Sequence, residues 1–375
     1  MFNPPFCPYK ACLFHAFPPK ERWWRKEGFH ETRCFGHVPR FRCRSCGRTF
    51  STQTFSLDFY AKRQIDYRSL EGLESSSISV RALARHLSCS CGSVLNRIDR
   101  LARQSLACHS RLRPLARRHE SVCIDGFVSF DRSQFFPNNI TISITHGSRY
   151  VLDYSHASIR RSGSMRPEQK IRREKLYRGL DFEKGAIVRS FTELLDELSR
   201  DRKPLRHRPL VIITDEKLEY LRAFHAHPLF RNQDENSRVV HLRVNSRLPR
   251  TFVNPLFPSN YLDREIRKDQ AGHRRETTCF NRNSANGMMR FACYVGWHNY
   301  RKRYLVKGHR DKNESHGEMA GIGKREIKEG REKMFGLRAF LSLEKLDRVE
   351  ERIWRKEIPT LGLQGPSYVP RFALA

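Results

Sequence analysis

Hydrophobic and polar positions follow a strand-like pattern in the middle of the chain. Five stretches of β-branched or alternating apolar residues are bounded by turn residues: 121–130, 140–146, 149–155, 210–214 and 238–244. The first three follow one another closely, with turns expected at 137–139 and 146–148, and predict an antiparallel meander. The fourth lies between Pro209 and Asp215 and is typical of a buried strand.

Apolar residues recur at helical spacing between and after these strands. The predicted helices cover 189–200, 216–226, 288–300 and 341–358, and another begins at Asn260, a residue type suited to an N-cap. Strands mixed with helices in this order predict an α/β fold, with one sheet that has antiparallel and parallel parts.

Two shorter amphipathic patterns precede the sheet, within residues 57–118. Apolar residues recur at helical spacing on both sides of a break at 88–92. Two short helices joined by a turn predict a helix-turn-helix module. The second helix would then carry Asn96, Arg97 and Arg100 outward, where these side chains can reach bases or phosphates of DNA. An ordinary helical hairpin is the alternative.

Residues 1–56 hold five of the eleven cysteines. Two pairs have short spacings: Cys7 with Cys12, and Cys43 with Cys46. Zinc takes four such ligands in a tetrahedron, so this segment predicts a structural Zn²⁺ site in a zinc ribbon, with a hairpin formed by 40–42 and 49–51. The first pair is spaced more loosely, which leaves His15, or Cys34 with His37, as substitute ligands. Free buried cysteines are the alternative to a metal site.

The charge balance points to a polyanionic partner. The 375 residues include 71 Lys and Arg against 40 Asp and Glu, a formal net charge of +31. Nucleic acid is the first candidate. An anionic membrane surface is the second, but no apolar stretch is long enough to span a bilayer, and we expect no signal peptide. Residues 102–119 are expected to form a basic linker.

Basic residues crowd a second segment, 156–180, which interrupts the strand pattern. Four of its arginines are candidates for gripping a DNA backbone: Arg160, Arg161, Arg172 and Arg173. Pro167 is placed as in the first turn of a helix. A solvated basic helix without a ligand fits the pattern equally well.

Carboxylates in two of the predicted strands suggest a metal-binding catalytic site. Asp125 lies within the first strand and Asp215 ends the fourth. If these strands are neighbours, the two side chains share a site, and an acid from the helix at 260 can join them. Carboxylates held close together need cations, and Mg²⁺ accepts such oxygens. Two ions about 4 Å apart suit phosphodiester transfer. The alternative is that each Asp caps a turn.

Several of these motifs together resemble the DDE transposases of bacterial insertion sequences, over most of the chain. The likeness rests on FRCRSCGRTFS, CIDGF, VIITDEKLEY, CFNRN and a helix ending in WHNYRKR. It implies an RNase H-like core at 119–305 and a helical extension at 306–375. It also implies Mg²⁺ or Mn²⁺ bound by Asp125 and Asp215, and a bacterial, cytoplasmic protein on the nucleoid. The implied partners are double-stranded DNA, as element ends and target, and further copies of the chain on that DNA.

The third acid of such a site is open between two residues of one helix. The distance from Asn260 favours Asp263, and the residue type usual in that family favours Glu265. Residues two apart on a helix point in different directions, so both cannot serve. Two other functions fit the same residues: a zinc-containing DNA-binding regulator with an inactive core, and a nuclease acting on RNA or branched DNA.

Overall fold

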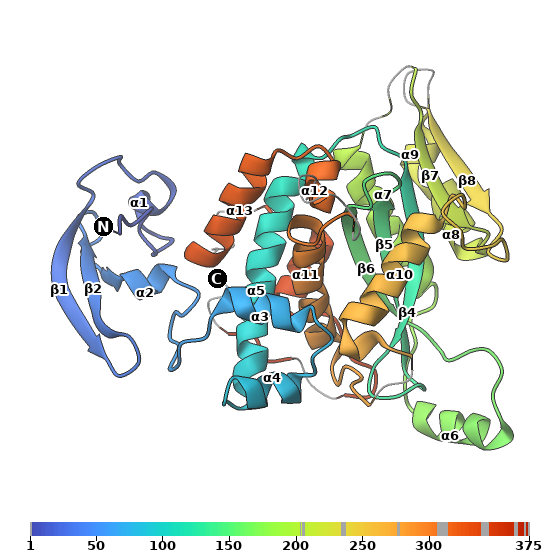
Figure 1. Ribbon diagram of the computed structural model, residues 1–375, viewed down its shortest axis with the longest axis horizontal. Helices are drawn as coiled ribbons and strands as arrows, with labels where there is room; N and C mark the ends of the chain where they lie inside the picture. Colours follow the sequence, from blue (N-terminus) through green and yellow to red (C-terminus); the bar gives the residue numbers. More distant parts are fainter. Residues whose placement is uncertain are drawn as a thin grey trace.

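The computed structural model describes most of the chain. Its described residues are 2–202, 204, 207–233, 238–275, 278–305, 314–338, 345–363, 367–370 and 373. They form a small N-terminal part, called here the cysteine module (residues 2–56), and a larger α/β body (Figure 1). The predicted mixed α/β fold is confirmed at this level.

The cysteine module is built on a three-stranded antiparallel sheet. Its elements are α1 (Leu13–Ala16), β1 (Trp24–Thr32), β2 (Gly36–Cys43), β3 (Thr49–Ser51) and α2 (Thr52–Phe55). Phe41 of β2 lies opposite Phe50 of β3, which confirms the predicted hairpin. Buried aromatic rings, including Trp23 and Phe55, make its small separate core. Strand β1, which pairs with β2, was not predicted from the sequence.

A five-stranded mixed sheet organises the larger body. Its strands are β4 (Val122–Phe130), β5 (Pro137–Thr145), β6 (Val151–Ser158), β7 (Leu210–Asp215) and β8 (Val239–Val244), in the spatial order β6-β5-β4-β7-β8. The first three pair antiparallel, while β7 runs parallel to both β4 and β8. The predicted strands and the meander are therefore confirmed. Residues 137–139 are not a turn, because Pro137 is the first residue of β5, a position where a strand tolerates proline.

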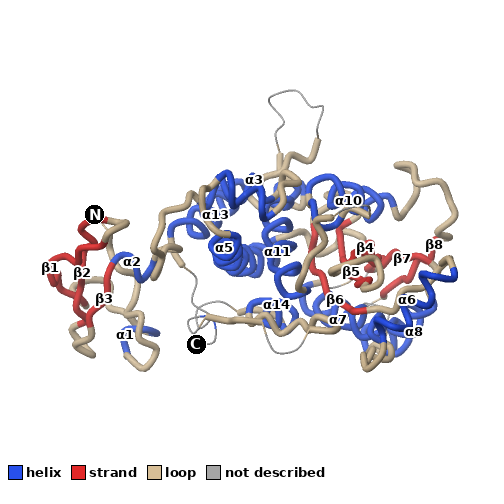
Figure 2. The backbone as a smooth tube through the Cα atoms, turned by 90° about the horizontal axis from the view of Figure 1, so that it is seen from below, coloured by secondary structure: helices blue, strands red, loops and turns tan. Residues whose placement is uncertain are grey.

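Helices cover both faces of this sheet. Helices α7 (Ala186–Asp201) and α8 (Leu218–Ala226) lie on one face and α10 (Phe257–Asp269) on the other (Figure 2). Shorter elements connect them: α6 (Pro167–Tyr177), α9 (Pro228–Arg231) and the 3-10 turns η1 (Arg113–Leu115) and η2 (Ala271–His273). The predicted start of α10 at Asn260 is wrong, since the helix begins at Phe257, ahead of Pro258.

A helical layer packs beside the sheet. Its members are α3 (Tyr67–Glu74), α4 (Val80–His86), α5 (Cys91–Leu112), α11 (Ser284–Tyr300), α12 (His316–Met319), α13 (Lys324–Gly336) and α14 (Arg348–Trp354). Helix α5 lies at the centre of this layer, against α11 and α13 (Figures 1 and 2). One continuous apolar core joins the layer to the sheet. Residues 341–344 of the predicted helix 341–358 lie outside the described residues, and of the remainder only Arg348–Trp354, α14, is helical.

Helix α5 corrects two predictions about residues 57–119. It extends for 22 residues to Leu112, so most of the expected basic linker is helix. Its apolar side chains share the core of the sheet instead of forming a separate small module. The two helices and the turn at 87–90 are present, but the second one is the main helix of the layer.

Candidate functional site

Asp125 and Asp215 come from neighbouring parallel strands. Cys123 of β4 pairs with Ile213 of β7, and continuing this register by two residues brings Asp125 opposite Asp215. Residues opposite each other in a parallel pair point to the same face of the sheet. The two acids are close enough for their charges to interact, since burial and the charge of Asp215 raise the pKa of Asp125 to about 6.

Asp263, on α10, lies close enough to Asp125 for their charges to interact and is a candidate third acid. Burial and the charge of Asp125 raise the pKa of Asp263 to about 8. Helix α10 packs against β4 and β5, on the face of the sheet opposite α7 and α8 (Figure 2). The three acids Asp125, Asp215 and Asp263 are called the carboxylate site below.

Glu265 points elsewhere, as expected for a residue two positions along a helix. Its carboxylate receives hydrogen bonds from Lys268, at 2.6 Å, and from Lys302. Burial opposes its ionisation, but these partners outweigh burial and hold the pKa of Glu265 below the usual value. Glu265 therefore belongs to an ion-paired network with Lys302 and Asp269, apart from Asp125 and Asp215.

Tyr220 and Gly126 lie on the opposite face of β4 from the side chain of Asp125, because consecutive strand residues alternate in direction. Tyr220, fully buried on α8, has its pKa raised well above the usual value by burial and by the charges of Asp125 and Asp215, with a smaller effect from Asp263. A Cβ on Gly126 would lie 2.2 Å from Oδ1 of Asn139 and 2.8 Å from the Tyr220 hydroxyl oxygen. The absence of a side chain at Gly126 thus lets both polar groups approach β4 beside Asp125.

Cationic side chains surround the three acids. Four of them act electrostatically on Asp125 or Asp263: Lys217, Arg250, Arg267 and Arg275. Arg250 and Arg275 are exposed, while Arg267 stacks on Phe127, 4.6 Å from the ring centre, and donates to the carbonyl oxygens of Val128 and His273. The site therefore combines half-buried negative charge with a positive rim. The sequence reasoning missed this rim and Tyr220, although the tyrosine stands within the DEKLEY motif.

The carboxylate site has the donor chemistry that Mg²⁺ or Mn²⁺ requires. Burial first, and then a neighbouring carboxylate, raises the pKa values of Asp125 and Asp263, and a divalent cation would relieve both effects. They are not among the described groups whose ligand atoms all lie within 4.8 Å of one another. Asp125 instead accepts a hydrogen bond from the Gly126 amide, and Asp215 accepts one from the Lys217 amide. A pair of ions about 4 Å apart is compatible with such a wider spread of ligands.

Four cysteines meet in the cysteine module as the sequence predicts. The sulfur atoms of Cys7, Cys12, Cys43 and Cys46 all lie within 4.8 Å of one another. The Cys7–Cys46 distance is 3.7 Å and the Cys12–Cys43 distance is 3.8 Å. A tetrahedron with metal–sulfur bonds of about 2.3 Å has edges of about 3.8 Å, so the cluster fits Zn²⁺.

The substitute ligands are used otherwise. The His15 ring bonds the carbonyl oxygen of Cys7 through Nδ1 at 2.7 Å, and the Cys34 thiol donates to the Lys62 carbonyl at 2.6 Å. Burial raises the pKa of Cys7 and of Cys43, whereas at Cys12 hydrogen bonds, first among them that from the Phe14 amide, outweigh burial and lower the pKa to about 7. A thiol that ionises this readily favours metal binding.

A second acidic group, unpredicted from the sequence, lies under the helical layer. Asp153, Asp347 and Glu350 bring carboxylate oxygens within 4.8 Å of one another, so these residues could hold a metal. The buried guanidinium of Arg113 already occupies this group, with Nη1 2.9 Å from Asp347 and 3.6 Å from Glu350. Burial and the charge of Asp347 raise the pKa of Glu350 to about 8. Arg113 supplies the positive charge that a metal would otherwise bring.

The residues predicted to read DNA from the second helix are placed differently. Arg97 is buried and donates to the Arg63 carbonyl at 2.7 Å, and Arg100 donates to the carbonyls of Leu57 and Phe59 at 2.6 Å. Both also donate to Oδ1 of Asn96. The prediction that Arg97 and Arg100 point outward is wrong, because they satisfy buried carbonyls of the preceding connection.

The basic insertion forms a helix at the same end of the sheet as Asp215. Strands β6 and β7 both run parallel to β4, so the segment after β6 and the end of β7 emerge at one edge. Pro167 opens α6 as predicted. Arg161 and Arg172 lie over the Phe135 ring and Arg160 over Phe182, which fixes their stems. Arg173 also donates to the Arg161 carbonyl.

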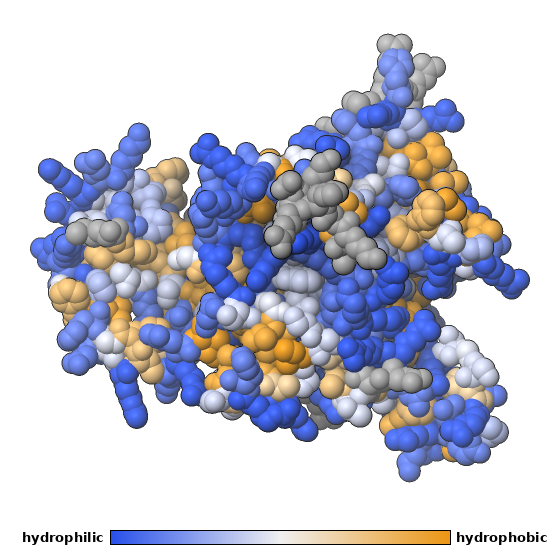
Figure 3. All heavy atoms as spheres, viewed as in Figure 1, coloured by the Kyte–Doolittle hydropathy of each residue, from blue (hydrophilic) through white to orange (hydrophobic). Residues whose placement is uncertain are grey.

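The visible surface is mostly hydrophilic, with smaller apolar areas such as the one at the outer edge of β7 and β8 (Figure 3). Within the described part of the chain, no helix has both the length and the apolar composition that a membrane crossing needs.

Searches against protein-family models and against curated proteins returned no match.

Proposed function

We propose that the protein is a DNA transposase of the DDE type, with an RNase H-like core. The observation that carries this proposal is the meeting of Asp125, Asp215 and Asp263 from β4, β7 and α10, within a basic chain. This is the layout that the sequence resemblance implies, with the first acid in the first strand of the sheet and the second at the end of the fourth. Asp263 is our choice for the third acid, because Glu265 is committed to Lys268 and Lys302.

In this proposal Asp125, Asp215 and Asp263 hold Mg²⁺ or Mn²⁺. The bound ions would supply an activated attacking oxygen and charge neutralisation at the phosphate. The exposed cations Arg250 and Arg275 bind the phosphates on either side of the reacting one. The buried hydroxyl of Tyr220 supports β4 at Gly126, from the opposite face of the sheet. Water attack frees a 3′ hydroxyl, and that hydroxyl then attacks the target DNA.

The remaining basic elements bind DNA away from the chemistry. Helix α6 lies at the edge of the sheet where Asp215 ends β7, so its arginines can hold the backbone of the DNA that enters the site. The cysteine module, with Zn²⁺ bound, contacts the element ends together with the region of α4 and α5. Two ends must be held at once, so we propose that several copies of the chain assemble on the DNA.

A strand-transfer assay tests this function. The substrate is DNA that carries the inverted repeats flanking the coding region, with Mg²⁺ or Mn²⁺ present. We expect joined products that are lost in Asp125→Asn, Asp215→Asn and Asp263→Asn, while DNA binding survives. Glu265→Gln is the matched control on the same helix and should keep strand transfer.

The alternatives give different results in the same assay. DNA binding without cleavage in the unmodified protein would favour a zinc-containing regulator. Cleavage without joining would favour a nuclease. Loss of strand transfer in Glu265→Gln but not in Asp263→Asn would overturn our choice of the third acid.

A further inference from the structure

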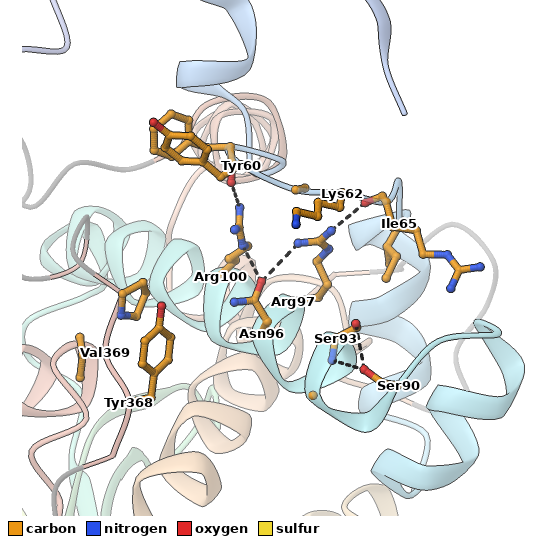
Figure 4. A pocket seen from close by; sticks show the side chains of 15 residues that line it. Tyr60, Lys62, Ile65, Ser90, Ser93, Asn96, Arg97, Arg100, Tyr368 and Val369 are labelled. Carbon is orange, nitrogen blue, oxygen red and sulfur yellow. Dashed lines mark hydrogen bonds between the residues drawn. The ribbon is translucent and has the colours of Figure 1, made fainter. Parts of the chain in front are cut away.

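A pocket beside the start of α5 is not used by the proposed chemistry. It has a volume of about 870 Å³ and lies between the connection 59–65, the first turns of α5 and the segment 368–370. Figure 4 shows Tyr60 on one side of it, Tyr368 on another, and Asn96 with Arg100 between them. This volume lies within the range of small-molecule sites, about 300–1,000 Å³.

The pocket is positively charged. Its described lining includes Lys62, Arg63, Arg97 and Arg100 and contains no carboxylate. Lys62 and Arg63 are exposed at its edge, whereas Arg97 and Arg100 form its fixed floor through their hydrogen bonds to backbone carbonyls. An anionic ligand is therefore favoured. Arg97 and Arg100 attract it electrostatically without having to move.

Two aromatic rings stand exposed around this charge. The exposed fractions are 82% for Tyr60 and 75% for Tyr368. Tyr60 has φ 54°, a left-handed conformation that is uncommon for a bulky residue. Its ring is backed by Phe59, with 4.3 Å between ring centroids, and Arg338 lies 3.9 Å from the Phe59 ring centroid. The connection thus holds a large ring in solvent at some conformational cost.

We propose that this pocket binds an unpaired nucleotide of single-stranded DNA. Tyr60 and Tyr368 both stack on bases of the strand, and Lys62 and Arg63 bind the adjoining phosphates. Aromatic rings interleaved with cations are the recurrent means of binding single strands without sequence preference. A paired duplex does not present its base faces to such rings, and the bonded Arg97 and Arg100 cannot reach its groove. This inference rests on the proposed function, because it takes the single strand to be part of the transposase's DNA substrate.

Binding of two oligonucleotides to the full chain with its metal bound tests this proposal. The first probe is an oligothymidylate of about twelve nucleotides, within the length that one such site covers. The second has the same length and phosphate charge but carries abasic residues. Anisotropy at one fixed salt concentration gives both affinities. We expect the protein to prefer the first probe.

Tyr60→Ala and Tyr368→Ala should each weaken binding of oligothymidylate about tenfold, the size of one lost stacking contact, and leave the abasic probe unchanged. Tyr60→Phe should keep the preference. Phe17→Ala removes an equally exposed ring, 74% exposed, from the cysteine module and is the matched control. Lys62→Ala should weaken both probes alike, because it removes a phosphate contact.

The proposal is overturned if the unmodified protein binds both probes equally, or if Tyr60→Ala changes both or neither. Failure here is separable from failure of the transposase function. Strand transfer and duplex binding that persist without base-dependent binding would reject only the pocket. A protein that binds no DNA at all would reject both.

Discussion

Replacing Asp263 by asparagine should make the metal-free protein more stable at pH 8, although it removes a proposed catalytic group. The fold raises the pKa of this carboxyl from 3.8 to about 8, so the folded protein holds its proton more tightly than the unfolded chain does. Between those pH values the folded state binds more protons, and stability falls as pH rises. Asparagine has no proton to lose and escapes this penalty.

The magnitude follows from the pKa difference. At about 1.36 kcal/mol for each pKa unit, the shift of Asp263 sets a ceiling of about 6 kcal/mol. Asp263 is partly exposed, so solvent screening reduces the expected gain to about 2–3 kcal/mol at pH 8. At pH 5 the gain should be roughly a third as large, because this pH is only about one unit above the pKa of the unfolded carboxyl, so ionisation favours the unfolded chain less.

Glu265→Gln should act in the opposite direction. The ionised form of Glu265 is stabilised by Lys268 and Lys302, so removing its charge leaves Lys302 with a weaker set of partners. We expect a loss of about 1–2 kcal/mol at pH 8. The two variants lie on one helix and remove one charge each, so their opposite signs test the electrostatics of the site directly.

Thermal unfolding with and without Mn²⁺ measures these changes. Without the cation, the melting temperature of Asp263→Asn should exceed that of the unmodified protein at pH 8 and approach it toward pH 4. With Mn²⁺ at about 100 times its dissociation constant, the unmodified protein should gain about 2.7 kcal/mol, and Asp263→Asn should gain clearly less. Metal affinity should rise with pH between about 6 and 8, as the carboxyls of Asp125 and Asp263 ionise.

A lower melting temperature for metal-free Asp263→Asn at pH 8 would refute this reasoning. So would a full response to Mn²⁺ in Asp263→Asn together with a lost response in Glu265→Gln. The latter result would move the metal site to the Lys302 network and withdraw Asp263 from it.

Two further changes test the structural clusters. Cys43→Ser should abolish metal binding by the cysteine module and unfold that module. The readouts are a loss of zinc content and a change in tryptophan fluorescence. The melting temperature of the larger body should stay the same. Arg113→Met should cost about 3–5 kcal/mol in urea unfolding, because Asp153, Asp347 and Glu350 lose their shared guanidinium. That cost should shrink at pH 5, where Asp153 and Glu350, whose pKa values burial raises, take up protons; an equal cost at pH 5 and pH 8 would contradict the assignment.

The sequence predicted correctly those features that depend on residues close together in the chain. All five strands of the sheet were predicted, because β-branched runs bounded by turns need no tertiary information to recognise. The four cysteines were found because zinc ligands have short spacings. The pair Asp125 and Asp215 required only that their two strands be neighbours, and β4 and β7 are.

Other features depended on contacts between residues far apart in the chain. Arg97 and Arg100 are residue types that often contact DNA. In the folded chain they instead donate hydrogen bonds to the backbone carbonyls of residues 57, 59 and 63. The choice between Asp263 and Glu265 could not be made from spacing, since it depends on where Lys302 lies, 37 residues beyond Glu265.

The central position of α5 has a consequence for how the chain is made. This helix is synthesised early, yet the surfaces it packs against, α11 and α13, follow roughly two hundred residues later. The nascent chain must therefore keep an apolar helix from aggregating while the sheet is being translated. For the same reason, a shortened product ending near residue 118 would lack the partners of α5, so it should not persist as a stable competitor for the DNA sites of the intact protein.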